Sequence, residues 1–199
     1  MICIVCKNSN TEVFAHFDDK KYWKCGTCKA IYLDKRNYLN SKEEYAHYLT
    51  HNNDIEDERY KQFLSKLMNP LIKELKENST GLDYGCGPGP ALAKMLEEIG
   101  HKIYVYDPFF FPIHENLSKK YDFICCTETI EHFHNPYKEF HKFNELIKEY
   151  KYISSKKGYD QSPMDNSTNS SEEVIKTISK IFLIRKEIYK YAFQDKIIG

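Results

Sequence analysis

Long hydrophobic runs and an excess of charge of one sign are both missing from this 199-residue chain. Its mean hydropathy is −0.64, and no stretch approaches the ~20 apolar residues that a membrane-spanning helix needs. Residues 1–6 have no basic segment and too short an apolar stretch for a secretory signal peptide. Lysine plus arginine equals aspartate plus glutamate at 29 each, which excludes a global basic field for non-specific nucleic-acid binding. We therefore expect a cytoplasmic protein with no membrane partner.

Four of the seven cysteines form two pairs, Cys3-x-x-Cys6 and Cys25-x-x-Cys28. The two-residue gap lets both thiolates of a pair reach one metal, and two such pairs complete a tetrahedral zinc site. Without an export signal, metal-bound or buried thiols are favoured over disulfides. A redox pair and four unrelated thiols are the competing interpretations. The remaining cysteines are expected to be small buried side chains: Cys86, Cys125 and Cys126.

The segments around these pairs predict a small zinc ribbon over residues 1–34. Residues 13–17 and 22–24 are typical of short strands joined by a polar turn, and residues 31–33 predict a third strand. So short a module buries little core, and a structural zinc would supply the missing stability. His16 is expected on the ribbon surface, since four cysteines already suffice for the metal.

Residues 82–89, Leu-Asp-Tyr-Gly-Cys-Gly-Pro-Gly, predict the end of a buried strand, a glycine turn and the start of a helix. Pro90 suits the first helical position, and Gly100 ends the helix. The next predicted strand, residues 103–106, ends on Asp107, an acid placed to accept hydrogen bonds from ribose hydroxyls. This pattern predicts a nucleoside-binding βαβ unit. The plain alternative is a glycine turn that holds no ligand.

The spacing Asp83-x-Gly85-x-Gly87-x-Gly89 differs from a dinucleotide fingerprint and resembles motif I of the class I methyltransferases that use S-adenosylmethionine. The resemblance implies that the glycine turn packs against the amino-acid part of the cofactor and that the acid after the second strand holds the ribose. It also implies a cofactor contact after a later strand, at residue 127. The cofactor-binding residues implied in this way are Asp83, Gly85, Cys86, Gly87, Gly89, Asp107, Pro108 and Thr127.

The run from Tyr121 to Phe133 is the second chemical constellation. Residues 123–126 predict a buried strand, and the run is similar to that of the ubiquinone-biosynthesis O-methyltransferases. Glu128-x-x-Glu131-His132 matches the E-x-x-E-H motif shared with those enzymes and with small-RNA 2′-O-methyltransferases, in which it helps to bind a divalent metal.

We expect Glu128, Glu131 and His132 to share one face of a helical turn. There they would hold Mg²⁺ or act as a base near a hydroxyl acceptor, and they are the candidate catalytic residues. The alternative is that Glu131 and His132 only anchor the turn by hydrogen bonds. Asn135 and Pro136 then predict the start of another helix.

Two segments depart from the family pattern. Only fourteen residues separate Asp107 from Asp122, too few for a helix, a strand and a helix, so this part is predicted to be an abridged, aromatic loop that covers the adenine. After Glu149 no Gly-Gly turn and apolar strand can be recognised. Residues 154–199 predict a polar linker and a C-terminal helix of unclear role. A truncated or frame-altered gene product is the alternative for this part.

The sequence thus predicts an α/β fold: an abridged Rossmann-like class I methyltransferase sheet preceded by a small zinc ribbon with four cysteine ligands. The expected divisions are a ribbon (1–34), a connector or lid (35–57), the methyltransferase domain (58–153) and the linker with its helix (154–199). Within the third division, apolar spacing from Tyr60 predicts a helix that Pro70 kinks or splits.

The expected activity is methyl transfer from S-adenosylmethionine to a small metabolite or sugar derivative. One alternative is an rRNA or tRNA methyltransferase, since a zinc ribbon before this domain also resembles bacterial rRNA guanine methyltransferases. Another is a non-catalytic remnant that binds a cofactor or a partner. The identity of the acceptor and the oligomeric state are left open by the sequence.

Overall fold

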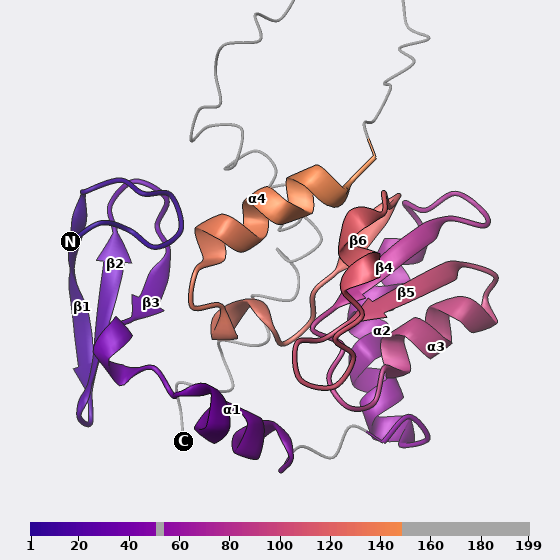
Figure 1. Ribbon diagram of the computed structural model, residues 1–199, viewed down its shortest axis with the longest axis horizontal. Helices are drawn as coiled ribbons and strands as arrows, with labels where there is room; N and C mark the ends of the chain where they lie inside the picture. Colours follow the sequence, from indigo (N-terminus) through magenta and orange to yellow (C-terminus); the bar gives the residue numbers. More distant parts are fainter. Residues whose placement is uncertain (51–53, 149–199) are drawn as a thin grey trace, which may run out of the picture.

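The computed structural model describes residues 1–50 and 54–148, which form two separate sheets joined by a connector (Figure 1). The predicted linker and helix at residues 154–199, and the last residues of the predicted methyltransferase domain, lie outside the described residues. No helix in the described ranges is long and apolar enough to cross a membrane.

The N-terminal sheet is antiparallel, with strand order β1-β2-β3. Its strands are β1 (Thr11–Phe17), β2 (Lys20–Cys25) and β3 (Ile31–Leu33). They match the three strands predicted for the ribbon, and His16 is exposed as predicted. A bulge lies between Val13 and Ala15, where the pairing register of β1 with β2 shifts.

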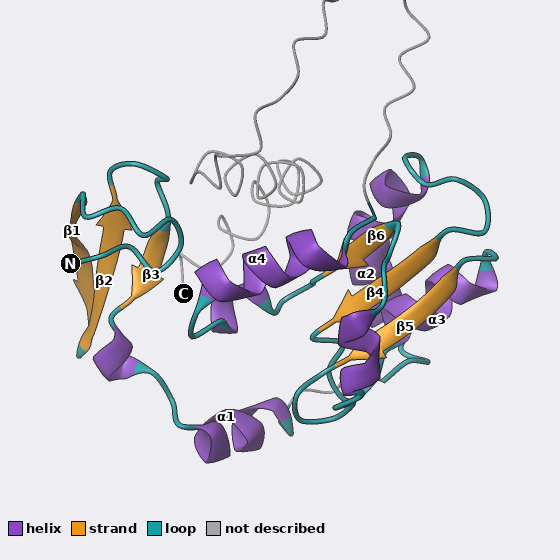
Figure 2. Ribbon diagram, turned by 45° about the horizontal axis from the view of Figure 1, so that its top comes forward, coloured by secondary structure: helices purple, strands orange, loops and turns teal. Residues whose placement is uncertain are grey.

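The connector contains the short 3₁₀ turn η1 (Lys35–Asn37) and the helix α1 (Ser41–Tyr48). Asn40 starts α1 through a capping box, in which its side chain accepts from the N–H groups of Lys42 and Glu43. No residue of α1 is buried. The helix lies between the two sheets in sequence, and in space it lies at the lower edge of the view, below the space between them (Figure 2).

The second sheet is parallel, with strand order β5-β4-β6. Its strands are β4 (Thr80–Tyr84), β5 (Lys102–Tyr106) and β6 (Phe123–Cys125). The helices around it are α2 (Glu58–Ile72), α3 (Ala91–Glu98) and α4 (Pro136–Leu146), with the 3₁₀ turns η2 (His114–Ser118) and η3 (Ile130–His132). The predicted βαβ unit is therefore β4-α3-β5, and Pro90 lies one residue before the helix, at the N-cap.

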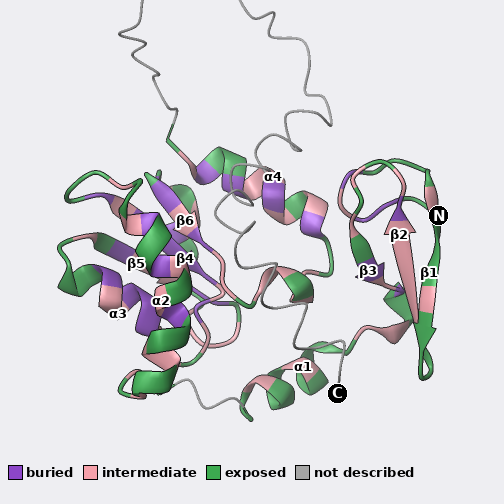
Figure 3. Cartoon of the chain, turned by 180° about the vertical axis from the view of Figure 1, so that it is seen from behind, coloured by how far each residue is buried: buried purple, intermediate pink, exposed green. Residues whose placement is uncertain are grey.

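Each face of the parallel sheet has its own core. Leu82 and Tyr84 of β4 pack with Phe140 and Phe143 of α4 on one face. Leu64 of α2 and Leu96 of α3 belong to the core on the other face, together with residues of β5 and β6. The alternation along β4 follows from the two-residue period of a strand. Buried positions therefore concentrate in these layers, whereas α1 is mostly exposed (Figure 3).

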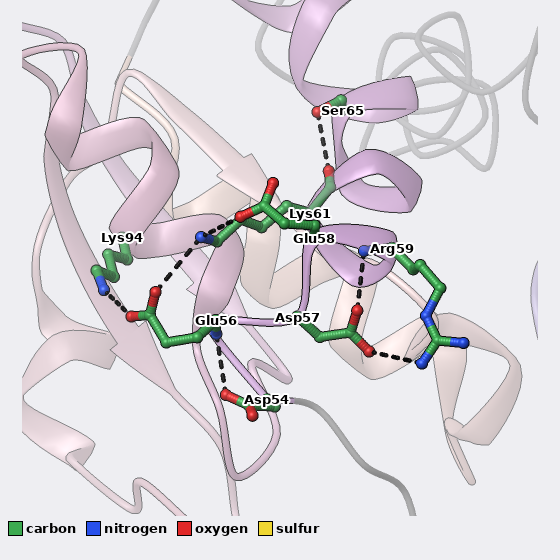
Figure 4. Close-up of polar contacts among 8 residues, drawn as sticks. All are labelled: Asp54, Glu56, Asp57, Glu58, Arg59, Lys61, Ser65 and Lys94. Carbon is green, nitrogen blue, oxygen red and sulfur yellow. Dashed lines mark hydrogen bonds and ion pairs between the residues drawn. The ribbon is translucent and has the colours of Figure 1, made fainter.

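The N-terminus of α2 is tied to α3 by charged side chains (Figure 4). Asp57 caps the helix by accepting from the Arg59 N–H at 2.9 Å, and Glu56 pairs with Lys94 of α3 at 2.6 Å. At the other end, Pro70 lies inside α2 without splitting it. A split at this residue, one of the two outcomes predicted, was wrong because Pro70 falls in the last turn, where its missing N–H removes a hydrogen bond next to the point where the helix ends. A kink at Pro70 stays a prediction.

The segment between β5 and β6 is abridged as predicted. It holds a loop closed by a bridge between Asp107 and Phe111, followed by η2. The buried Asn116 of η2 donates from Nδ2 to the Val105 carbonyl at 2.9 Å. This hydrogen bond covers part of the outer edge of β5.

At the opposite edge of the sheet, the chain returns after α4 and forms a parallel bridge between Tyr121 and Ile147. The Tyr121 N–H donates to the Leu146 carbonyl at 2.8 Å, and the Lys148 N–H donates to the Tyr121 carbonyl at 2.9 Å. Ile147 is therefore paired in parallel with this edge, although no strand pattern is visible in the sequence at this point.

Candidate functional site

The glycine turn after β4 depends on glycine at two positions. Gly85 and Gly87 have φ angles of 76° and 65°, which side chains other than glycine rarely adopt. A Cβ at Gly85 would also collide with the side chain of Thr129. The Gly85 N–H donates to the Tyr106 carbonyl at 2.7 Å, so the turn is fastened to the end of β5. Gly89 needs no such conformation and precedes the start of α3.

Asp107 joins the glycine turn to the aromatic loop. Its Oδ2 accepts from the Gly87 N–H at 3.0 Å, and its Oδ1 accepts from the N–H groups of Phe109 and Phe110 at 2.8 and 3.1 Å. A carboxylate offers about four acceptor positions, so these three bonds leave capacity for another donor. Pro108 follows on the exposed side of the loop.

Asp83 lies beneath the turn rather than on its surface, and is 4% exposed. Burial, together with the nearby charge of Asp107, raises the pKa of Asp83 to about 7. A hydrogen bond from the backbone N–H of Ala93, in the first turn of α3, lowers the pKa of Asp83 and offsets part of this increase. Burial likewise raises the pKa of the Cys86 and Cys125 thiols, which are buried as predicted, while Cys126 is half-buried.

The loop after β6 meets the glycine turn through two threonines. Thr129 Oγ1 lies 3.0 Å from the Gly85 carbonyl and 2.9 Å from the Thr127 carbonyl, and these two acceptors share its single hydroxyl proton. Thr127 Oγ1 is buried and has no hydrogen-bond partner among the described residues. Beside it lies a cavity of about 50 Å³, lined by residues of α2 and by Cys126, Thr127 and Glu128. A threonine in a loop belongs to no recognisable sequence pattern, so the contact of Thr129 with the glycine turn could not be inferred from the sequence.

The three candidate catalytic residues do not share one helical face. Glu128 has a φ of 51° and lies before η3, whereas Glu131 and His132 belong to that turn. The expected single face was wrong because the left-handed conformation of Glu128 keeps it out of the helical turn. Across residues 1–50 and 54–148, the four ribbon cysteines are the only group of three or more potential ligands gathered closely enough for a metal. The Mg²⁺ site therefore stays a prediction from the resemblance.

The connector helix covers this end of the sheet. The ring of Tyr45 lies 5.7 Å from that of Phe109 and 5.6 Å from that of Phe110. The Tyr48 ring meets the His132 ring edge to face at 5.4 Å, and its hydroxyl donates to Glu44 at 2.9 Å. Burial and this carboxylate raise the pKa of Tyr48. Polar residues of the connector thus contact both the aromatic loop and the candidate catalytic turn.

The four ribbon cysteines form a compact tetrad. The Sγ atoms of Cys3 and Cys28 are 3.7 Å apart, those of Cys6 and Cys25 are 3.6 Å apart, and all four lie within 4.8 Å of one another. Zinc–sulfur bonds of about 2.3 Å in a tetrahedron place the sulfurs about 3.8 Å apart, whereas a disulfide needs about 2.05 Å. The residues therefore fit zinc.

Both cysteine pairs have the same backbone geometry. The Lys7 N–H donates to the Cys3 carbonyl at 3.1 Å, and the Lys29 N–H donates to the Cys25 carbonyl at 3.0 Å. Lys7 and Lys29 have φ angles of 60° and 63°. The Cys28 thiol hydrogen-bonds Cys3, which lowers the pKa of Cys3 and raises that of Cys28. Thiols this close repel one another once ionised, so a bound cation is needed for all four to be thiolates.

A family model described as a methyltransferase domain matches residues 55–166, more than half of the chain. With the parallel sheet and the glycine turn between β4 and α3, the chain belongs to the class I S-adenosylmethionine-dependent methyltransferases. No curated protein and no solved structure shows significant similarity to the chain.

Proposed function

We propose that this protein transfers the methyl group of S-adenosylmethionine to a small-molecule acceptor, a metabolite or sugar derivative. The observation that carries the proposal is the glycine turn tied to Asp107 at the carboxyl ends of β4 and β5, in a chain of the methyltransferase family. Ligands of open parallel sheets bind at this edge of the strands.

The residues present fit the cofactor. Gly85 and Gly87 expose backbone without a Cβ, Asp107 keeps acceptor capacity for a ribose hydroxyl, and Thr127 has a buried hydroxyl without a partner among the described residues. Gly89, Cys86, Pro108 and the buried Asp83 complete the proposed cofactor-binding set. When bound, the cofactor supplies an electrophilic methyl group on a sulfonium.

The protein's own part is to orient the acceptor, exclude water and take up a proton. His132 is the proposed base for the acceptor, because its imidazole lies on η3 next to the ring of Tyr48, at the end of the sheet that carries the glycine turn. Glu128 and Glu131 precede it in sequence and would hold the acceptor, or a Mg²⁺ ion as the E-x-x-E-H resemblance implies. The rings of Tyr48 and Phe109, whose centres lie 5.7 Å apart, would shield this region from water.

We propose one structural zinc on Cys3, Cys6, Cys25 and Cys28. All seven cysteines lie in the described part of the chain and none of them forms a disulfide, which fits a reducing compartment, and we propose the cytoplasm.

An RNA acceptor is the second candidate, and a specific surface favours it. Phe14 and Phe17 of the ribbon are 47% and 59% exposed, and Lys24 Nζ lies 5.8 Å from the ring centre of Phe14. Exposed aromatic rings with lysines are suited to stacked bases and phosphates. The net charge of zero favours the small-molecule acceptor.

Turnover of methyl-labelled S-adenosylmethionine tests the proposal. The zinc-loaded protein is incubated in parallel with a metabolite extract, sugar nucleotides and total RNA, with Mg²⁺ added, and label transferred to each fraction is counted. Label in a small-molecule fraction supports the first candidate, and label in RNA supports the second. Thermal stabilisation by NAD but not by S-adenosylmethionine would overturn both.

A further inference from the structure

The first cysteine pair of the ribbon packs directly against the core of the methyltransferase domain. Val5, between Cys3 and Cys6, contacts the cysteine core of the ribbon and also the aromatic core beneath α4. Its N–H donates to Cys3 Sγ at 3.4 Å. One small side chain thus joins a metal ligand to a core that includes Tyr84, the residue before the glycine turn.

The same segment completes the N-terminus of α4. The Ile4 carbonyl accepts from the Tyr137 N–H at 3.3 Å, and Lys7 Nζ lies 4.9 Å from the centre of the Tyr137 ring. Tyr137 is the second residue of the helix, so its N–H has no partner within the helix. Asn135 caps the next free N–H, that of Lys138, at 3.3 Å. The ribbon therefore supplies a cap that the helix does not provide for itself.

Helix α4 holds in place the loop that precedes it, between β6 and α4. Phe133, between η3 and α4, meets the rings of Tyr84 and Phe143, with its centroid 6.1 Å from each. The same loop carries His132 and, earlier, the Thr129 hydroxyl that bonds the Gly85 carbonyl. Packed groups therefore run without a break from the cysteine tetrad to the glycine turn.

We propose that the zinc-bound ribbon braces the loop of residues 126–135, so that zinc binding and cofactor binding strengthen each other. Zinc orders the first cysteine pair, which places Val5 and the Ile4 carbonyl against α4. Without them the start of α4 loses its cap, and the contact of the loop with Gly85 loosens. The inference rests on the proposed cofactor site and the proposed zinc. Because coupling is reciprocal, the cofactor raises the affinity of the ribbon for zinc by the same factor.

Val5→Ala tests the brace in the full-length, zinc-loaded protein. It keeps all four cysteines and shortens the side chain that joins the two cores. S-adenosylhomocysteine, titrated by calorimetry, is expected to bind roughly fivefold more weakly or worse. Val13→Ala is the matched control, because Val13 is 45% exposed on β1, and it should leave the affinity within about twofold. Metal analysis should find the zinc content of both variants equal to that of the unchanged protein.

Hydrogen exchange at the Tyr137 amide supplies a second readout that needs no ligand. Its exchange, and that of residues 130–135, should be faster in Val5→Ala and in chelator-treated protein than in the zinc-loaded protein. Unchanged exchange and unchanged affinity in a zinc-loaded Val5→Ala variant would overturn the brace. If the unchanged zinc-loaded protein fails to bind S-adenosylhomocysteine, the proposed function fails instead, and the exchange at Tyr137 alone decides the brace.

Discussion

Individual residues in this protein are constrained mainly where the glycine turn meets the loop after β6. Gly85 is limited twice, by its φ of 76° and by the Thr129 side chain that fills the space of a Cβ. Glycine spacing allowed the turn to be predicted, because a strand, a tight turn and a helix each have a sequence pattern. The threonine opposite it has none, and neither does the left-handed backbone of Glu128, which is why the single helical face predicted for Glu128, Glu131 and His132 was wrong.

Gly85→Ala should lower the free energy of unfolding by about 1–3 kcal/mol, because it adds both backbone strain and a collision. Thr129→Ala in the same chain should recover part of that loss, since it removes Cγ2 and Oγ1, the two closest of the three atoms in conflict, and leaves only Cβ. Gly100→Ala is the control: Gly100 also has a positive φ, 93°, but open space around its Cα, and so it reports strain alone. Equal losses for Gly85→Ala and Gly100→Ala in urea unfolding would show that the collision with Thr129 is unimportant.

Asp83 should make stability depend on pH. Its pKa is raised in the folded protein to about 7, from an ordinary value of 3.8, so between these values the folded state binds more protons than the unfolded state. Stability due to this group is therefore full below about pH 3.8 and is lost progressively as the pH rises to about 7. Asp83→Asn should unfold at higher urea concentration than the unchanged protein at pH 8, and its advantage should be clearly smaller at pH 5. A larger advantage at pH 5 would contradict the sign.

At the scale of elements, the strands and helices with clear periodicity were predictable, and their contacts with one another were not. The ribbon strands, the βαβ unit and α4 with its Asn135 cap all occur where predicted. The bridge of Ile147 to Tyr121 involves one residue, which is too short to show alternation. Val5 reads as an ordinary apolar residue in sequence, and only its place between two cores reveals what it does.

Cys25→Ser should abolish zinc binding and unfold the ribbon, because the metal replaces the core that so small a module lacks. Metal analysis of freshly purified, reduced protein should find about one zinc in the unchanged chain and none in the variant. Cys126→Ser, outside the tetrad, should keep the metal. A zinc-free unchanged protein would refute the site.

Tyr48→Ala should weaken S-adenosylhomocysteine binding if α1 acts as a lid, since the ring contacts Phe109 and His132. Tyr48→Phe retains the ring and loses only the hydrogen bond to Glu44, so it should bind more tightly than Tyr48→Ala. If calorimetry finds that both variants bind S-adenosylhomocysteine with the affinity of the unchanged protein, the connector is a linker and not a lid.

On the scale of the whole molecule, the balance of charges determines how strongly the chain binds nucleic acid non-specifically. With 29 basic and 29 acidic side chains, it lacks the field that concentrates phosphates around nucleic-acid-binding proteins. A poly(U) RNA of about 20 nucleotides should therefore bind with a dissociation constant above ~100 μM at physiological salt, weaker than ordinary non-specific binding. Fluorescence anisotropy measures this. Micromolar affinity that Phe14→Ala and Phe17→Ala abolish would instead favour the RNA acceptor.

The amide of Asn116 has a consequence for how copies of this chain behave toward one another. An outer strand with free carbonyl and N–H groups invites edge-to-edge pairing with another molecule, and β5 is such a strand. Asn116 Nδ2 occupies the Val105 carbonyl, and Lys119 and the Tyr121 hydroxyl bond Asn116 in turn, which hold it there. A side-chain amide thus occupies one of the carbonyls at which the strand of a neighbouring molecule would dock, which disfavours edge-to-edge pairing between copies of the chain.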